Sequence, residues 1–254
     1  MASTIRFHTV ALLLSFALLG AGVTAPATAQ ISSDRPGFGD GASMVAPRTF
    51  QAEMGYAFNG NGLNSHELGQ LLLRYGLTSR IEVRGGVGSY VVNESPFDNG
   101  YSGTALGTKV RLLQSDLWTL SGVATLGLPT GTGAFDSADD RARQELKLAF
   151  DGALGEDITL SVNGGTSFFY SGGVQDDRDV SVLFIPTLSF GLTDGVGAYV
   201  GYAGFYDDGR NANWVEGGFT YLYDPNTQLD VNVGLQLDDY SDSFFLGVGV
   251  ARRF

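Results

Sequence analysis

The stretch from Gln228 to Leu237, QLDVNVGLQL, alternates strictly between apolar residues and residues that are polar or glycine. Successive side chains of a β-strand point to opposite faces, so this period of two predicts a strand with one apolar and one polar face. The same pattern, less regular, recurs along the chain, and no segment after residue 30 shows the helical spacing of apolar residues. The sequence therefore predicts an all-β protein.

The predicted strands are long, and the connections between them alternate in length. About twelve strands of about ten to thirteen residues are expected between residues 50 and 254, whereas five or six residues are usual in a globular protein. A tilted strand that crosses a bilayer needs about nine to eleven residues. Short connections, such as 78–80 and 224–226, alternate with longer ones, such as 93–103 and 130–142. This predicts a closed antiparallel transmembrane β-barrel with short periplasmic turns and longer outer loops.

Aromatic residues gather near both ends of the predicted strands, as expected for rings at headgroup depth. The set expected at the periplasmic ends comprises Phe50, Tyr75, Trp118, Phe150, Phe190, Tyr223 and Phe254. The set expected at the outer ends comprises Tyr56, Phe58, Phe168, Tyr170, Tyr206, Trp214 and Phe244. An aromatic-rich β-sandwich is the alternative fold. Pro186 lies inside an expected strand and has no N–H, so we expect a local bulge or a missing ladder bond there.

The first 29 residues have the pattern of a secretory signal peptide. Arg6 precedes an apolar run from Val10 to Val23, and Ala27-Thr28-Ala29 is a small-x-small cleavage pattern. A transmembrane anchor is the alternative, but a helix of this length rises only about 21 Å, and a bilayer core is about 30 Å thick. The expected domains are the signal peptide at 1–29, an N-terminal segment at 30–48 and the transmembrane barrel at 49–254.

The segment 30–48 has two interpretations. It carries Asp34 and Arg35, followed by Pro36, ahead of the first predicted strand. Either the segment folds into the lumen, where Asp34 and Arg35 pair with wall charges as a small plug, or it is a flexible periplasmic lead-in.

The composition excludes several classes of function. The chain has 15 Lys and Arg against 27 Asp and Glu, a formal net charge of −12, which argues against a nucleic-acid partner. It has no cysteine, which excludes disulfides, thiolate metal ligands and cysteine nucleophiles. The expected outer loops are acidic, with Asp207 and Asp238 among their residues, but the spacing of a calcium loop is missing. We expect no metal site and no cofactor.

His66 is the only histidine after the predicted signal peptide, and it raises the alternative of an envelope hydrolase. A histidine acting as general base needs a nucleophile within reach. Ser65 is adjacent in sequence, but neighbours along a strand point to opposite faces. No nucleophile motif accompanies His66, so we expect a rim histidine with ordinary hydrogen bonds and no enzyme.

Charged residues on the polar face of the predicted strands are candidates to line the lumen. They are Arg74, Glu82, Arg84, Lys109, Arg111, Glu145, Lys147, Asp151, Glu216 and Asp230. Between the basic and the acidic groups lies an uncharged wall that includes Leu183 and Ile185, along which an aromatic ring would slide at little desolvation cost. The charges either line an open pore or pair across the lumen and close it.

Several motifs resemble those of one known family. They are SDRPGF at 33–38, QAEMGY at 51–56, GLTSRIEVR at 76–84, LGLPTG at 126–131 and VARRF at 250–254. On these motifs the chain resembles the outer-membrane proteins of the family named putative MetA pathway of phenol degradation. The resemblance implies the outer membrane of a Gram-negative cell and the movement of hydrophobic or aromatic compounds, and it carries no catalytic residue.

We therefore expect an outer-membrane channel or transporter for small hydrophobic or aromatic compounds. The alternatives are a structural or adhesive barrel with a blocked lumen and, second, the envelope hydrolase. Expected partners are outer-membrane lipid and lipopolysaccharide, a small-molecule substrate and the barrel-assembly machinery. The terminal Phe254 resembles the signal that this machinery reads, whereas Arg252 departs from its apolar alternation and would have to snorkel to the headgroups.

Overall fold

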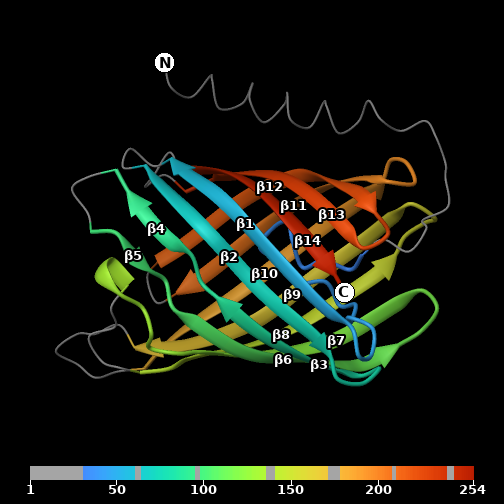
Figure 1. The fold of residues 1–254 in the computed structure, drawn as a ribbon, viewed down its shortest axis with the longest axis horizontal. Coiled ribbons are helices and arrows are strands. Elements are labelled where there is room, and N and C mark those ends of the chain that lie inside the picture. The colour runs from blue at the N-terminus through green and yellow to red at the C-terminus, as the bar shows by residue number, and fades with distance from the viewer. Residues whose placement is uncertain are drawn as a thin grey trace, which may run out of the picture.

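The computed structural model describes residues 31–60, 64–94, 98–135, 141–170, 178–207, 210–238 and 243–254, so the predicted signal peptide lies outside the described residues. The described chain forms one antiparallel sheet that closes into a barrel (Figure 1). β1 (Phe50–Gly60) pairs with β2 (Ser65–Gly76) on one side and with the last strand, β14 (Phe244–Arg253), on the other. The prediction of a closed barrel is confirmed. Among the described residues, no helix is long and apolar enough to cross a membrane.

The remaining strands follow one another around the barrel. They are β3 (Ile81–Val87), β4 (Tyr90–Asn93), β5 (Gly100–Tyr101), β6 (Thr104–Gln114), β7 (Trp118–Gly127), β8 (Arg143–Ala153), β9 (Ile158–Tyr170), β10 (Arg178–Gly191), β11 (Val196–Asp207), β12 (Arg210–Asp224) and β13 (Thr227–Gln236), with one 3-10 turn, η1 (Gly133–Phe135), before β8. β3 and β4 both pair with β2 and form one wall strand, and β5 and β6 form the next. The barrel therefore has twelve wall strands, as predicted.

The two composite wall strands are broken side by side. The N–H of Gly88, between β3 and β4, donates to the carbonyl of Gly103 at 2.8 Å, and the N–H of Ser102 donates to the carbonyl of Ser89 at 2.9 Å. Backbone hydrogen bonds thus continue across both breaks. This explains why the alternating sequence pattern predicts single strands here.

Connections of different length mark the two ends of the barrel. One end, the short-turn rim, carries the tight connections 77–80, 115–117, 154–157, 192–195 and 225–226. The barrel begins and ends there, because the N–H of Phe254 donates to the carbonyl of Phe50 at 2.8 Å. The other end, the long-loop rim at the left of Figure 1, carries longer connections such as 128–142. The predicted alternation of short turns and longer loops is confirmed for most of the barrel, whereas the connections 61–64 and 208–209 are as short as the tight turns.

Apolar side chains face outward and polar side chains face inward. In β13 the side chain of Val231 is 51% exposed, whereas the neighbouring Asp230 is 5% exposed. Arg74, Lys109 and Glu82 are among the largest fully buried side chains of the described chain. Such residues are almost never fully buried in a soluble protein unless they are paired. An apolar outer band around a polar interior is the arrangement that a lipid bilayer requires.

Pro186 interrupts the strand pairing on one side of β10 and causes no bulge. The pairing of β10 with β9 runs unbroken through Pro186 and Val162. The pairing with β11 skips Ile185 and Pro186 and then resumes in the same register. The missing N–H of proline explains the gap.

Trp214 does not belong to the outer aromatic girdle where the sequence placed it. Its ring lies inside the barrel, with its centroid 5.7 Å from that of Phe38. Residues two apart on a strand share a face, so Trp214 points into the lumen with Glu216, which is 3% exposed. The prediction for Trp214 was wrong because it considered only position along the strand.

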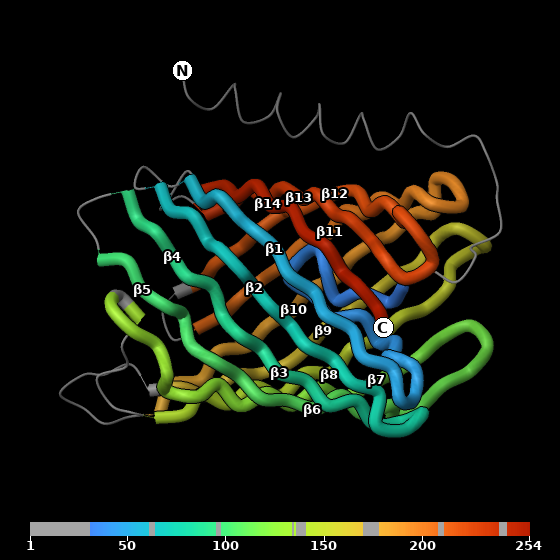
Figure 2. The backbone as a smooth tube through the Cα atoms, viewed as in Figure 1, coloured from blue at the N-terminus to red at the C-terminus, as the bar shows by residue number. Residues whose placement is uncertain are grey.

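Residues 31–48, named the lumen segment from here on, precede β1 and run inside the barrel. Figure 2 shows this blue trace within the wall, nearer the short-turn rim. Ile31, Ala42 and Val45 are almost fully buried, although the segment forms neither helix nor strand. Pro47 forms an isolated bridge to Gly76 of β2, and β1 begins soon after it.

Candidate functional site

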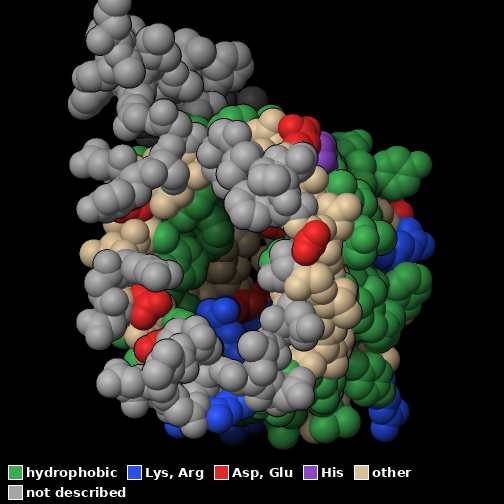
Figure 3. All heavy atoms as spheres, turned by 90° about the vertical axis from the view of Figure 1, so that its left-hand side faces the viewer, with side chains coloured by type: hydrophobic (Ala, Val, Ile, Leu, Met, Phe, Trp, Pro, Cys, Tyr) green, Lys and Arg blue, Asp and Glu red, His purple; other side chains and the backbone are tan. Residues whose placement is uncertain are grey.

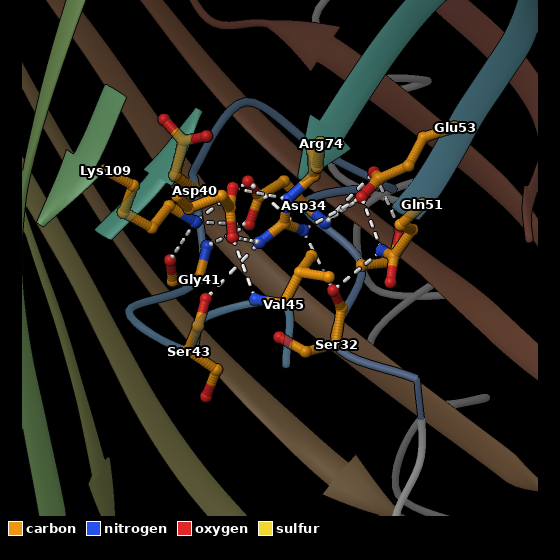
Figure 4. A network of polar contacts seen from close by, with 12 residues as sticks. Ser32, Asp34, Asp40, Gly41, Ser43, Val45, Gln51, Glu53, Arg74 and Lys109 are labelled. Carbon is orange, nitrogen blue, oxygen red and sulfur yellow. Dashed lines mark hydrogen bonds and ion pairs between the residues drawn. The ribbon is translucent and has the colours of Figure 1, made fainter. Parts of the chain in front are cut away.

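The carboxylate of Asp34 lies at the centre of a buried network of charges in the lumen (Figure 4). Its Oδ2 lies 2.6 Å from Nη2 of Arg84, 2.9 Å from Nζ of Lys109 and 3.4 Å from Nη1 of Arg74. Nζ of Lys109 also donates to the carbonyl of Gly41 at 2.7 Å. Three cations from three wall strands thus converge on one residue of the lumen segment.

Two wall carboxylates complete the charge balance around Arg74. Nε of Arg74 lies 2.7 Å from Oε1 of Glu82, and Nη1 lies 2.9 Å from Oε1 of Glu53. Glu82 also accepts the N–H of Val45 at 2.8 Å, and Glu53 accepts the hydroxyl of Ser33 at 2.9 Å. The paired charges of β1, β2 and β3 are therefore bonded to the lumen segment as well as to each other.

Asp40 makes a second set of contacts farther around the wall. Its carboxylate lies 2.8 Å from Nη2 of Arg84 and 2.5 Å from Nζ of Lys147, which in turn lies 3.1 Å from Oε1 of Glu145. The backbone of Asp40 forms two hydrogen bonds of 2.8 Å with the side-chain amide of Asn163 in β9. Paired bonds of this kind fix the segment relative to β8 and β9.

Phe38 contacts the opposite side of the barrel through aromatic rings. Its centroid lies 5.6 Å from that of Phe205, 5.7 Å from that of Trp214 and 5.4 Å from that of Phe245. The N–H of Phe38 donates to Oε1 of Glu216 at 3.0 Å. Among the described residues the buried apolar side chains beside it are Leu183, Ile185 and Ala203. This side of the lumen is held by ring packing and few polar bonds.

Arg35 lies in a notch made by two glycines of neighbouring strands. Gly55 of β1 and Gly249 of β14 are directly paired, and a methyl group on either would overlap the guanidinium of Arg35. The guanidinium donates to Oε1 of Gln70 at 2.8 Å and lies 3.5 Å from Oδ1 of Asp230. The notch lets the side chain reach the wall at the junction of the first and last strands.

The lumen segment contacts every wall strand of the barrel. The contacts run through Glu53 in β1, Arg74 in β2, Arg84 in β3, Lys109 in β6, Ser121 in β7, Lys147 in β8, Asn163 in β9, Ile185 in β10, Phe205 in β11, Glu216 in β12, Asp230 in β13 and Phe245 in β14. An ordered peptide therefore lies across the lumen and divides it into two compartments.

Eight of the ten lumen candidates contact this segment directly. They are Arg74, Glu82, Arg84, Lys109, Lys147, Asp151, Glu216 and Asp230, of which Asp151 accepts the N–H of Ala42 at 2.7 Å. In the described part of the chain, Glu145 forms its ion pair with Lys147, and Arg111 donates to Gln114 at 2.8 Å near the short-turn rim. The candidates predicted from the sequence did not include Glu53, although its position on the polar face of the first predicted strand indicated that it faces the lumen. They also did not include Phe38 and Asp40, which no strand pattern marks.

The two compartments differ in their lining. Toward the short-turn rim lies a cavity of about 580 Å³ with a mostly polar lining that includes Asp151, Asn163, Tyr199, Glu216 and Thr220. At the opposite end, Figure 3 shows a hollow mouth with hydrophobic side chains on one side and Lys and Arg side chains on another.

His66 lies on the outer face and not in the lumen. Its Nδ1 is 2.8 Å from the hydroxyl of Tyr56, its ring stacks on that of Tyr56, and its Nε2 lies 3.5 Å from Oε1 of Glu94. Phe58 packs beside it with a centroid distance of 5.3 Å. These contacts hold His66 within the aromatic belt near the long-loop rim.

Two residues near the rims have local partners. Asp238, in the connection after β13, accepts two hydrogen bonds of 2.6 Å from Asn213. Slight burial raises the pKa of Asp238, but the hydrogen bonds from Asn213 and Gln236 outweigh it and hold the pKa below its usual value. At the short-turn rim, Nη1 of Arg252 lies 3.2 Å from Oδ2 of Asp224, and its guanidinium lies 5.9 Å from the ring of Phe254.

A closed barrel of twelve long antiparallel strands, apolar outside and polar inside, defines the class of outer-membrane β-barrel proteins. Within this class, the chain belongs to the family described as "Putative MetA-pathway of phenol degradation", which matches residues 33–254. A search of curated proteins finds no match to the chain.

Solved structures of the same class are similar in fold. The NanC porin superposes with a TM-score of 0.60 at 9% identity, covering 79% of this chain and 98% of that one. The KdgM porin gives 0.55 at 13% identity, covering 80% and 99%. The translocator domain of the autotransporter NalP from Neisseria meningitidis gives 0.55 at 13% identity, covering 81% and 88%. At these identities the similarity concerns the fold alone.

Proposed function

We propose that the protein is a channel of the cell outer membrane for small hydrophobic or aromatic compounds, and that the lumen segment sets which solutes pass. The family and the barrel class support a channel. The short-turn rim would face the periplasm and the long-loop rim the outside, as in other barrels of this class. Surrounding lipid, lipopolysaccharide and the assembly machinery, which would read the end at Phe254, complete the proposed environment.

One observation carries the proposal, and it is the unequal attachment of the lumen segment. On the side of β1, β2, β3, β6 and β8, buried ion pairs hold the segment. On the side of β10 and β11, the contacts are ring packing between Phe38 and the wall. Polar contacts of the segment resume at Glu216 in β12 and at Asp230 in β13. A path between the lumen segment and the wall therefore opens at the lowest cost on the apolar side, because no ion pair has to be broken between Phe38 and β10 or β11.

A path along this apolar side discriminates between solutes by desolvation. A sugar or a hydrated ion would lose hydrogen bonds to water while passing Leu183 and Phe205 and would gain none there. A phenol ring would lose little, because most of its surface is apolar. The path thus favours aromatic over sugar-like solutes of the same size.

A liposome-swelling assay tests the proposal with phenol, a short fatty acid and glucose. We expect phenol to enter fastest and Leu183→Glu to slow it, because a charge then stands in the apolar path. Ser189→Glu is the matched control, since Ser189 lies on the same strand but lines the polar cavity. Glucose entering as fast as phenol, or equal slowing by the two variants, would overturn the proposal.

The structural alternative of a barrel with a blocked lumen also has an observation in its favour, namely that the segment contacts every wall strand. In that case no solute enters wild-type liposomes above the rate of protein-free vesicles. Leu183→Glu then changes only the stability of the barrel.

A further inference from the structure

A second cavity lies in the lumen toward the long-loop rim, away from the ion pairs of the lumen segment. It has a volume of about 290 Å³ and is lined by Arg143, Phe169, Ser181, Phe205, Asp207 and neighbouring residues of β12. Cavities that take drug-sized ligands start at about 300 Å³, so this one suits a single-ring compound.

Arg143 differs from the cations that hold the lumen segment. Arg74, Arg84, Lys109 and Lys147 each lie within 3.5 Å of a carboxylate. In the part of the chain that the structure describes, the guanidinium of Arg143 has no carboxylate at ion-pair distance. It donates to the hydroxyl of Ser167 at 3.4 Å and lies over the ring of Phe169 at 5.2 Å. Its remaining N–H groups are available to a ligand, and a guanidinium binds a carboxylate through two parallel hydrogen bonds.

Two phenylalanine rings give the same cavity an apolar part. Phe169 lies beneath Arg143, and Phe205 belongs to the ring cluster around Phe38. A bound ring would gain offset or edge contacts with them, as aromatic pairs do. Asp207 lines the same cavity.

We propose that this cavity is a binding site for a small aromatic acid, with its carboxylate on Arg143 and its ring against Phe169 and Phe205. The inference rests on the proposed channel, for which it names a substrate class and an entry site. Tight binding requires a ligand with both a carboxylate and an aromatic ring. A ring alone gives Arg143 no anionic partner, and a carboxylate alone makes no contact with the two phenylalanine rings.

The test is calorimetric titration of the folded protein in detergent micelles with benzoate, toluene and acetate. Benzoate should bind more tightly than either of the other two. Arg143→Gln should weaken benzoate binding at least about tenfold, as expected for the loss of a charge-assisted pair. Phe205→Leu should weaken benzoate and leave the weak binding of acetate unchanged.

Arg178→Gln is the matched control. Arg178 stands near the same rim, but on the outer face of the barrel, where it lies 4.4 Å from the ring centroid of Phe168 and donates to Gln144. Its loss removes the same charge without touching the cavity, so benzoate binding should not change. Equal weakening by Arg143→Gln and Arg178→Gln would overturn the site, and so would acetate or toluene binding as tightly as benzoate.

The calorimetric titration and the liposome-swelling assay together test the binding site and the proposed channel independently of each other. Binding of benzoate that depends on Arg143, without uptake of any solute into liposomes, supports the site and contradicts the channel. Uptake of phenol without such binding supports the channel and contradicts the site. Each variant is first shown to be folded by its shift in gel migration on boiling, so a misfolded variant is not counted.

Discussion

Oδ2 of Asp34 lies 2.6 Å from Nη2 of Arg84 in a part of the lumen where both side chains are less than a tenth exposed. The same oxygen lies 2.9 Å from Nζ of Lys109. One carboxylate of the lumen segment thus neutralises charge from β3 and from β6. Because a buried charge that loses its partner is strongly unfavourable, the position of the segment depends on this carboxylate.

Replacing Asp34 with Ala should free the lumen segment. Loss of one partner from a buried charge network costs about 3–5 kcal/mol, and the segment can avoid this cost by leaving the wall. We expect a higher single-channel conductance in planar bilayers. Asp116→Ala is the control, since Asp116 is exposed on a short turn. Equal conductance of the two variants would contradict the idea that Asp34 holds the lumen segment in place.

Replacing Phe38 with Ala should expose Trp214 to water. Removing a buried phenylalanine ring costs about 3–5 kcal/mol and leaves the faces of Phe205, Trp214 and Phe245 without their partner. The chain has 2 Trp residues, so Trp118→Phe makes Trp214 the sole reporter. In that background, fluorescence emission should shift to longer wavelength with Phe38→Ala. An unchanged spectrum would mean that Phe38 does not shield Trp214.

An arginine on the outer face should cost far more than one on the inner face. Val231→Arg places a charge where lipid is expected and should destabilise the barrel by about 2–4 kcal/mol. Thr220→Arg is the matched comparison, since Thr220 lines the cavity near the short-turn rim and pairs across the sheet with Asp230. Urea titrations of the refolded variants in lipid vesicles measure the difference. Equal costs would mean that the faces of β12 and β13 are assigned wrongly.

The folded protein should resist SDS at room temperature and change its gel migration after boiling. A closed sheet has no edge at which unfolding can begin, because β1 is bonded to both β2 and β14. Gel electrophoresis with and without boiling measures this. Identical migration of a sample with strong β circular dichroism would be incompatible with closure.

The alternating pattern predicts the wall of the barrel well because lipid enforces it. Outward positions that contact lipid must be apolar, so a stretch such as 228–237 reveals its two faces directly. The breaks near Gly88 and Gly103 leave no such trace, since backbone bonds alone carry the sheet across them. Trp214 was placed wrongly because aromatic rings occur both in the outer belts and inside this lumen.

The contents of the lumen were harder to predict than its wall. Charged residues on inward positions could be found one strand at a time. Their partners could not, because Asp34 and Asp40 lie outside any strand, and the cations that they bind are brought together only when the sheet closes. Sequence reasoning therefore left open whether these charges pair with each other or with an inserted peptide.

The lumen segment comes before every strand in the chain, yet some of its contacts are made by the last ones. Phe38 needs Phe245 of β14, and Arg35 needs Asp230 of β13. The complete set of contacts can therefore form only after the final hairpin has been synthesised and paired. Completion of these contacts is a late step in folding, and the tether of the segment to β1 makes that step intramolecular. The rate of this step should therefore not depend on the concentration of the protein.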